Sequence, residues 1–251
     1  MKYLVGGEPF HLGKDGGGVG VLLLHGFTGS PYEIRALAQS LHRAGFGVMA
    51  PALPGHATVN TDLNRITSER YFAAADEAFD AAARRFDRFY VAGLSMGGVL
   101  ALHLAATRPV SGAILISTPV FLSPLVATAL PILHQWVPNA YAPANISAWQ
   151  GNVIGYKSAS ISALKRVADV LRRVKSELAR VNAPILIVHS TRDATAPVSN
   201  ARYIRDHVSS SICRLKILTR GRHLLTLPQY LPLFEQDVLQ FLAEAEAMAP
   251  S

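Results

Sequence analysis

The sequence predicts an α/β fold in which a mostly parallel central sheet carries helices on both faces. Short apolar runs alternate with helix-forming runs at close spacing, which is typical of right-handed strand–helix–strand crossovers. Several of these runs are continuously apolar, as in parallel strands that are buried on both faces. The chain has 251 residues, of which 50% are hydrophobic and 16% are charged, so a sizeable core can form and wholesale disorder is not expected.

The first half is expected to supply four strands and three helices. The first helix has Ser30 as its cap, Pro31 at its first position and Glu33 at its third, a pattern typical of a capping box. Gly45 ends that helix, and residues 51–56 form a loop after the next strand. The expected strands are Pro9 to Leu12, Val19 to Leu24, Gly47 to Ala50 and Phe89 to Ala92, and the expected helices are Pro31 to about Ala44, Ser68 to Phe86 and Met96 to Ala106.

The second half completes the alternation after one interruption. Strands are expected at Gly112 to Ser117, Pro184 to His189 and Ile212 to Leu218, with helices at Asn200 to Val208 and Tyr230 to Met248. Between Ser117 and Pro184 no strong strand is predicted, and from Pro109 to Tyr156 there is no Asp, Glu, Lys or Arg.

We interpret this interruption as a small helical cap, residues 119–181, inserted into a core of residues 1–118 and 182–251. The apolar first half, with a helix from Leu122 to Trp136, is expected to line a substrate entrance. The charged helix from Ile161 to Val181 is expected to face water. Ordinary core-packing helices are the alternative. Five prolines interrupt the uncharged stretch, so a membrane-spanning helix is not expected.

Charge and cysteine content limit the partners and the location. The formal net charge is +7, but the basic residues are scattered and no nucleic-acid motif accompanies them, so no nucleic-acid partner is expected. Contact with a lipid surface and the oligomeric state are left open. Cys213 is the only cysteine, which excludes an intramolecular disulfide. The first residues lack the apolar run of a secretory signal, and we expect a cytoplasmic protein.

The candidate nucleophile is Ser95, in the sequence Gly-Leu-Ser-Met-Gly of residues 93–97. This G-x-S-x-G motif lies between a predicted strand and a predicted helix, which is the context of a nucleophile elbow. Gly93 and Gly97 leave room where a Cβ would collide with neighbouring backbone. The helix beginning at Met96 directs its first amide groups toward the serine, where negative charge develops during acyl transfer.

A serine nucleophile needs a base, and the base needs an acid that orients it. With an elbow of this kind the chain order is serine, acid, histidine, each after a strand. Asp193 is the only carboxylate in the loop after the strand that follows the cap, and His223 lies in the loop after the last strand. The other histidines lie before the elbow or on predicted helices and strands. We therefore predict Asp193 as the acid and His223 as the base.

Two backbone amides are expected to stabilise the oxyanion. One belongs to Met96, and the other to Phe27, which follows His25-Gly26 after the second strand. His25 is expected to brace this loop by hydrogen bonds and to take no part in acid–base chemistry. The residues expected to bind the substrate are Phe27, Phe121, Leu125, Trp149 and Leu224. No metal or organic cofactor is expected.

Four segments together resemble the bacterial carboxylesterase and monoacylglycerol lipase branch of the α/β-hydrolases. They are residues 25–31 (His-Gly-Phe-Thr-Gly-Ser-Pro), residues 93–98, the Arg192-Asp193 turn and residues 221–227. The resemblance spans almost the whole chain. It implies the α/β-hydrolase fold, the three catalytic residues and two amides given above, and a small cap over an apolar pocket. The chain departs from that branch at Arg222 and Pro228, and its cap lacks the charge-rich composition of that branch.

The catalytic residues predict hydrolysis of carboxylic esters through an acyl-enzyme on Ser95, and the resemblance implies esters of short- to medium-chain acyl groups or monoacylglycerols as substrates. The same three residues also serve in the hydrolysis of C–C bonds, lactones or amides and in acyl transfer. A non-catalytic protein that binds an apolar ligand is the third alternative.

Overall fold

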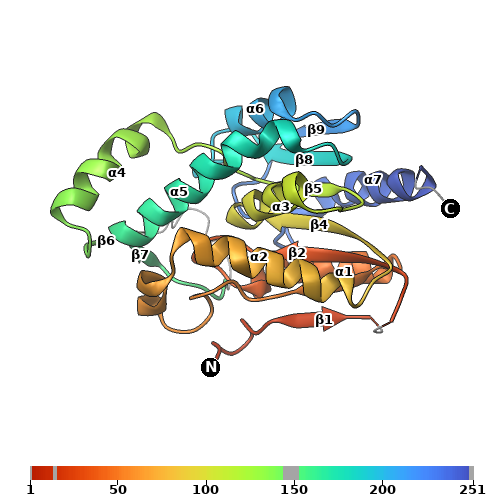
Figure 1. Cartoon of the computed structure of the whole chain (residues 1–251), viewed down its shortest axis with the longest axis horizontal. Helices are drawn as coiled ribbons and strands as arrows, with labels where there is room; N and C mark the ends of the chain where they lie inside the picture. The colour runs from red at the N-terminus through yellow and green to blue at the C-terminus, as the bar shows by residue number, and fades with distance from the viewer. Residues whose placement is uncertain (1, 14–15, 144–152, 249–251) are drawn as a thin grey trace.

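The computed structural model describes residues 2–13, 16–143 and 153–248 (Figure 1). Seven strands of these residues form the central sheet, in the order β1-β3-β2-β4-β5-β8-β9. β1 pairs with β3 in antiparallel fashion and every other pairing is parallel. The bounds are β1 Phe10–Leu12, β2 Val19–Leu24, β3 Gly47–Ala50, β4 Arg88–Leu94, β5 Ala113–Ile116, β8 Ile185–Ser190 and β9 Cys213–Leu218. The predicted α/β fold with a mostly parallel sheet is confirmed.

Helices cover both faces of the sheet (Figure 1). α1 and α7 pack on one face, and α2, α3, α5 and α6 pack on the other. The bounds are α1 Arg35–Arg43, α2 Ser68–Ala83, α3 Met96–Thr107, α4 Pro124–Trp136, α5 Ile161–Glu177, α6 Ser199–His207 and α7 Glu235–Ala247. Short 3₁₀ turns lie at η1 Pro31–Ile34, η2 Asn60–Arg65, η4 Leu178–Arg180 and η5 Leu231–Leu233.

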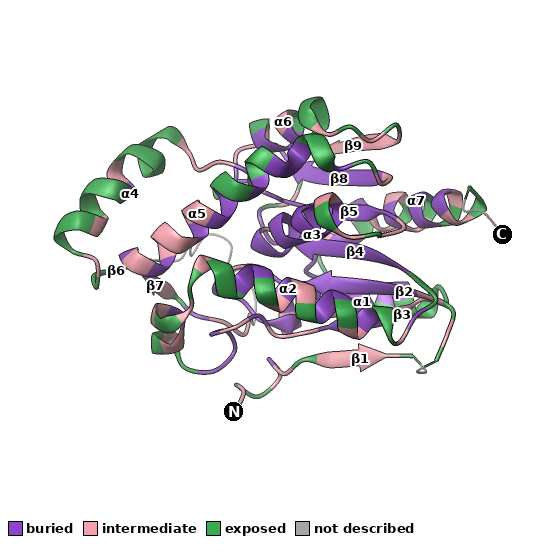
Figure 2. Ribbon diagram, in the orientation of Figure 1, coloured by how far each residue is buried: buried purple, intermediate pink, exposed green. Residues whose placement is uncertain are grey.

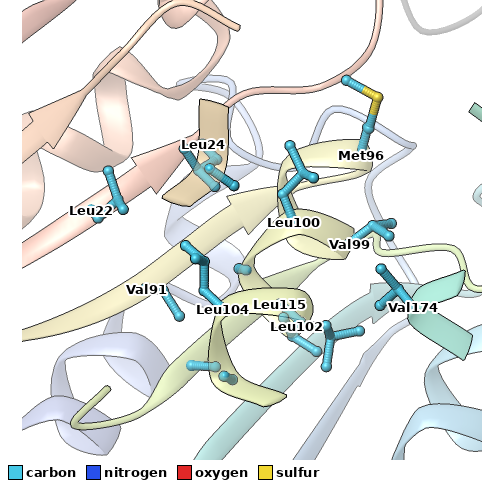
Figure 3. Close-up of a cluster of buried hydrophobic side chains, with 14 of the residues drawn as sticks. Leu22, Leu24, Val91, Met96, Val99, Leu100, Leu102, Leu104, Leu115 and Val174 are labelled. Atoms are coloured by element: carbon cyan, nitrogen blue, oxygen red, sulfur yellow. The ribbon is translucent and has the colours of Figure 1, made fainter. Parts of the chain in front are cut away.

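The continuously apolar strands divide their side chains between two cores. In β2, Leu22 and Leu24 belong to the core under α3, whereas Val21 and Leu23 belong to the core under α1 and α7. Successive side chains of a strand point to opposite faces, so a strand covered on both faces must be apolar at every position. Figure 3 shows the first of these cores, to which Leu22 and Leu24 of β2 and several leucines of α3 contribute side chains. This core holds α3, and with it the elbow, rigidly on the sheet.

The segment between β5 and β8 carries α4, a short antiparallel pair of strands and α5. The pair consists of β6 (Tyr141–Pro143) and β7 (Ser158–Ser160), which the sequence did not predict. α4 extends away from the sheet and is largely exposed (Figures 1 and 2). It packs against α5. None of the described helices combines the length and the apolar character that crossing a membrane requires.

α5 does not face water on all sides. Val170 and Val174 are fully buried in the core beside α3, while Arg172 is exposed. Figure 2 shows α5 with buried and exposed residues along its length. Its amphipathic sequence thus gives it one face on the core and one in solvent. Because α5 shares its apolar face with the core, the division into a core and a cap of residues 119–181 stays a prediction.

Candidate functional site

Ser95 lies in the tight turn between β4 and α3, in a strained backbone conformation. Its φ is +54° and its ψ is −118°, a region that residues with a Cβ rarely adopt. A Cβ on Gly93 would collide with the backbone of Gly97, and one on Gly97 would collide with the carbonyl of Leu24. The amide of Ser95 donates to the carbonyl of Ile116 at 2.8 Å. Glycines on both sides and this anchor to β5 hold the strained turn in place.

The three residues predicted as nucleophile, base and acid come together at the carboxyl ends of β4, β8 and β9. Nε2 of His223 lies 2.9 Å from Oγ of Ser95, and Nδ1 of His223 lies 2.7 Å from Oδ2 of Asp193. His223 and Asp193 are both buried. The distances are those of hydrogen bonds. In this arrangement the imidazole can take the proton of the serine, and the carboxylate stabilises the imidazolium that forms.

The carboxylate of Asp193 is held on both of its oxygens. Oδ1 accepts from the amides of Thr195 and Ala196, at 2.8 and 2.9 Å. Oδ2 faces His223 and also Nε2 of His189, which is 3.4 Å away. Burial alone would raise the pKa of this carboxyl, but the charge of His223 and the hydrogen bonds from His189, His223 and Ala196 hold it well below its usual value. Asp193 is therefore ionised throughout the physiological range.

The loop after β2 carries the amide of Phe27, and His25 fixes that loop. The amide of Leu53 donates to Nε2 of His25 at 3.0 Å, so the proton of the neutral ring is on Nδ1, which donates to the carbonyl of Gly26 at 2.9 Å. Burial and the neighbouring His56 lower the pKa of His25 to about 3, so the ring stays neutral. A trans peptide directs its C=O and N–H in opposite directions. With the Gly26 carbonyl tied to His25, the Phe27 N–H points the other way.

The amide of Met96 is the first of α3. An N–H at this position has no partner within its own helix, and it adjoins Ser95 in the chain. The sequence predicts that the Phe27 and Met96 amides act together as a pair of donors beside the serine. Their assignment as an oxyanion hole stays a prediction.

Ser95 and His223 open into a cavity of about 560 Å³ beneath α4 and α5. Of the residues predicted to bind substrate, Phe27, Phe121, Leu125 and Leu224 line it, and Met96 lines it as well. Trp149 lies outside the described residues. Further apolar lining comes from both helices: Val126, Ala129, Leu130 and Leu133 of α4, and Ile161, Leu164, Val167 and Leu171 of α5. This cavity fits an apolar chain that ends at the serine.

Two polar residues at the site were not predicted from the sequence. His189 was interpreted only as part of a strand, but its side chain is fully buried beside Asp193. Glu33 was predicted to complete a capping box with Ser30. Its carboxyl instead accepts a hydrogen bond from the amide of Gly26, at 3.2 Å, and Glu33 lines the cavity. The spacing His189-x-x-x-Asp193 was the available signal for the first residue. For Glu33 the local capping pattern concealed a longer-range contact.

No cluster of three or more metal-ligating side chains occurs among residues 2–13, 16–143 and 153–248.

Comparison with known proteins agrees with the sequence resemblance. Residues 19–228 match the family of serine aminopeptidases, S33. The chain is 32% identical over 244 residues to a thermostable monoacylglycerol lipase of Bacillus sp. (strain H-257), with 96% of each chain covered. It is 25% identical over 248 residues to a carboxylesterase of Bacillus subtilis (strain 168), covering 95% of this chain and 97% of the other.

Solved structures agree with the fold. One of the metagenome-derived lipolytic enzymes LipS and LipT superposes with a TM-score of 0.86 at 29% identity, covering 96% of this chain and 100% of the other. The monoacylglycerol lipase of Paleococcus ferrophilus superposes with a TM-score of 0.76 at 19% identity, covering 98% and 100%. The resemblance to the α/β-hydrolases is thus confirmed.

Proposed function

Because this chain belongs to the serine aminopeptidase S33 family and is an ester-hydrolysing serine hydrolase, we propose that it cleaves esters of short- to medium-chain acyl groups, including monoacylglycerols, through an acyl-enzyme on Ser95. The observation that carries this proposal is the chain of contacts Ser95–His223–Asp193, at 2.9 and 2.7 Å, which opens into an apolar cavity.

In the acylation step, His223 takes the proton of the Ser95 hydroxyl as the oxygen attacks the ester carbonyl. Asp193 holds the proton of His223 on Nδ1, so that Nε2 is free to accept the serine proton. The imidazolium that forms faces an ionised carboxylate. His223 then gives its proton to the leaving alcohol, and the acyl group stays on Ser95. Water, deprotonated by the same imidazole, releases the acid in the second half of the reaction.

The tetrahedral intermediate needs donors at the place where its oxygen becomes negative. In this proposal the amides of Phe27 and Met96 supply them. The strained φ of Ser95 and the bond between His25 and Gly26 fix both amides before the substrate binds. Donors that are already oriented require no reorganisation during the reaction.

The His25→Ala variant tests this positioning. It removes the donor to the Gly26 carbonyl and leaves the buried Leu53 amide without its partner. We expect kcat to fall about 10- to 100-fold, less than the roughly 10²- to 10³-fold typical of deleting a donor outright, because the Phe27 amide remains. KM for a short p-nitrophenyl ester should stay within about threefold. A raised KM with unchanged kcat would contradict a role in orienting the oxyanion donor.

The cavity favours an ester with an uncharged acyl chain over the free amino terminus of a peptide. Glu33 is the single residue with an acidic side chain among the described residues that line it, and burial raises the pKa of Glu33 to about 8, against the hydrogen bond from Gly26. Its carboxyl is thus neutral at pH 7. A substrate ammonium group would lose its hydration in this cavity without gaining a carboxylate partner.

A substrate panel tests the proposal. Turnover is measured on p-nitrophenyl esters of acyl chains from two to sixteen carbons, on monoacylglycerols, and on leucine p-nitroanilide as the aminopeptidase substrate. We expect kcat/KM for the preferred ester to exceed that for the anilide at least about 10³-fold, since ammonium burial alone costs several kcal/mol. Faster turnover of the anilide would overturn the ester assignment. A cytoplasmic location and contact with a lipid surface stay predictions.

A further inference from the structure

A buried carboxyl lies behind the loop that carries the Phe27 amide. Glu33, in η1, is 5% exposed, and its Oε2 accepts from the amide of Gly26 at 3.2 Å. The backbone carbonyl of Glu33 accepts a hydrogen bond from Oγ1 of Thr226 at 2.7 Å. This bond connects η1 to the loop that carries His223. A Cβ on Gly29 would collide with the carboxyl group of Glu33. The carboxyl therefore fills the space that the two glycines of the loop, Gly26 and Gly29, leave open.

The same carboxyl is a neighbour of Ser95. An ideal Cβ on Gly26 would lie 3.3 Å from Oε2 of Glu33 and 3.5 Å from Cβ of Ser95. Glu33 also lines the cavity into which Ser95 and His223 open. A charge on Glu33 would thus act across Gly26, from a buried position, on the atoms that react at Ser95.

No described residue forms an ion pair with Glu33. Three titratable side chains on the elements around it are engaged elsewhere. His25 donates to the Gly26 carbonyl, and His223 contacts Ser95 and Asp193. Tyr156, whose amide donates to the Thr28 carbonyl, directs its hydroxyl toward Thr58 and Gly55.

The basic residue nearest in sequence also points away. The guanidinium of Arg35, which follows η1, lies over the ring of Phe10 at 4.3 Å. Within the part of the chain that the structure describes, no cation acts on the pKa of Glu33. Burial, opposed by the Gly26 hydrogen bond, raises the pKa of Glu33 to about 8.

We propose that Glu33 is a positioning residue that supports the oxyanion loop as a neutral acid, and that its ionisation suppresses ester hydrolysis at alkaline pH. The inference rests on the proposed function. The neutral carboxyl supports Gly26 and Gly29 without adding charge beside the developing oxyanion. The carboxylate repels that oxyanion at short range, which lowers the rate about tenfold or more.

The first test is the pH dependence of kcat/KM from about pH 6 to about pH 10, measured by titrating the acid released from a soluble short-chain ester. The proteins are the wild type, Glu33→Gln, Glu33→Ala and the control Glu177→Gln. Glu177 is also buried, but it pairs with His103 between α3 and α5, away from the cavity.

We expect the Glu33→Gln variant to keep its activity within about threefold at pH 7 and to lose the alkaline decline, because the amide retains an acceptor and cannot ionise. Glu33→Ala should lose about tenfold in kcat at pH 7, because the loop loses its support. Glu177→Gln should decline as the wild type does. An alkaline decline that persists in Glu33→Gln, or that is absent from the wild type, would overturn the proposal.

The second test is thermal unfolding, which requires no turnover. A buried Glu33 keeps its proton up to about pH 8, whereas a glutamate in the unfolded chain loses it above about pH 4.3. The folded state binds the extra proton in this window, so wild-type stability falls as pH rises through it. The difference in Tm, Glu33→Gln minus wild type, should therefore increase as the pH is raised from about pH 5 to about pH 8. A difference that does not change with pH would show that Glu33 is not a neutral acid, whether or not Ser95 is the nucleophile.

Discussion

Replacing Ser95 with alanine is expected to lower kcat for a p-nitrophenyl ester by about 10⁵-fold or more, which corresponds to about 7 kcal/mol of transition-state stabilisation. The oxygen that attacks the ester is absent from this variant, and His223 Nε2 loses the hydroxyl that lies 2.9 Å away. The residual activity of the variant comes from substrate binding and from the oxyanion donors. The measurement is kcat under substrate saturation, with enzyme concentration high enough to detect the residual rate.

The fold should survive this change. Ser95 has a strained φ of +54°, and alanine meets the same backbone restriction as serine, so the strain is unchanged. The side chain makes one described hydrogen bond, to His223. The free energy of unfolding of the Ser95→Ala variant should therefore stay within about 1 kcal/mol of the wild-type value. Retention of more than about one hundredth of the wild-type kcat in a folded variant would rule out Ser95 as the nucleophile.

The Asp193→Asn variant is expected to lose about 10³- to 10⁴-fold in kcat. Oδ1 of Asp193 accepts from two backbone amides, whereas Oδ2 faces His223 and His189. An asparagine that satisfies the two amides through its oxygen must turn its NH₂ group toward the imidazoles. Its N–H then donates to Nδ1 of His223 and leaves the proton on Nε2, where the serine proton has to go.

The matched control for this variant is Asp206→Asn, which changes an exposed carboxylate on α6 that pairs with Arg205. Its kcat should be unaltered. KM for both variants should stay within about threefold, because neither residue lines the cavity. An Asp193→Asn variant that retains more than about one tenth of wild-type kcat would place the acid elsewhere.

Strands and helices could be predicted from the sequence because each one carries a local signal. β2 is continuously apolar, β8 begins with four apolar residues, and α3 follows a glycine-flanked serine. The order of serine, acid and histidine reduced the candidates to residues that follow strands, so Asp193 and His223 could be selected before any distance was known. Their proximity depends on the sheet order β4-β5-β8-β9, which brings these strand ends to one edge.

The features that escaped prediction depend on contacts between distant residues. The α5 helix has a charged composition, but only packing against α3 decides which of its faces is buried. The β6–β7 pair is three residues long on each side, too short to produce a pattern in the sequence. Glu33 matched a local capping motif, whereas its carboxyl is directed to Gly26, seven residues earlier, by the course of the loop. Such contacts have no periodic signature.

The central claim is that Ser95 forms the covalent intermediate, and a fluorophosphonate probe tests it most directly. In this reaction the Ser95 oxygen bonds to phosphorus and fluoride leaves, with His223 taking the serine proton. Peptide mass spectrometry of the labelled protein should show one phosphonate on the peptide that contains Ser95, in proportion to the activity lost. No label should appear on Ser95→Ala. Inactivation with Ser95 unmodified, or with the phosphonate on another residue, would contradict the account.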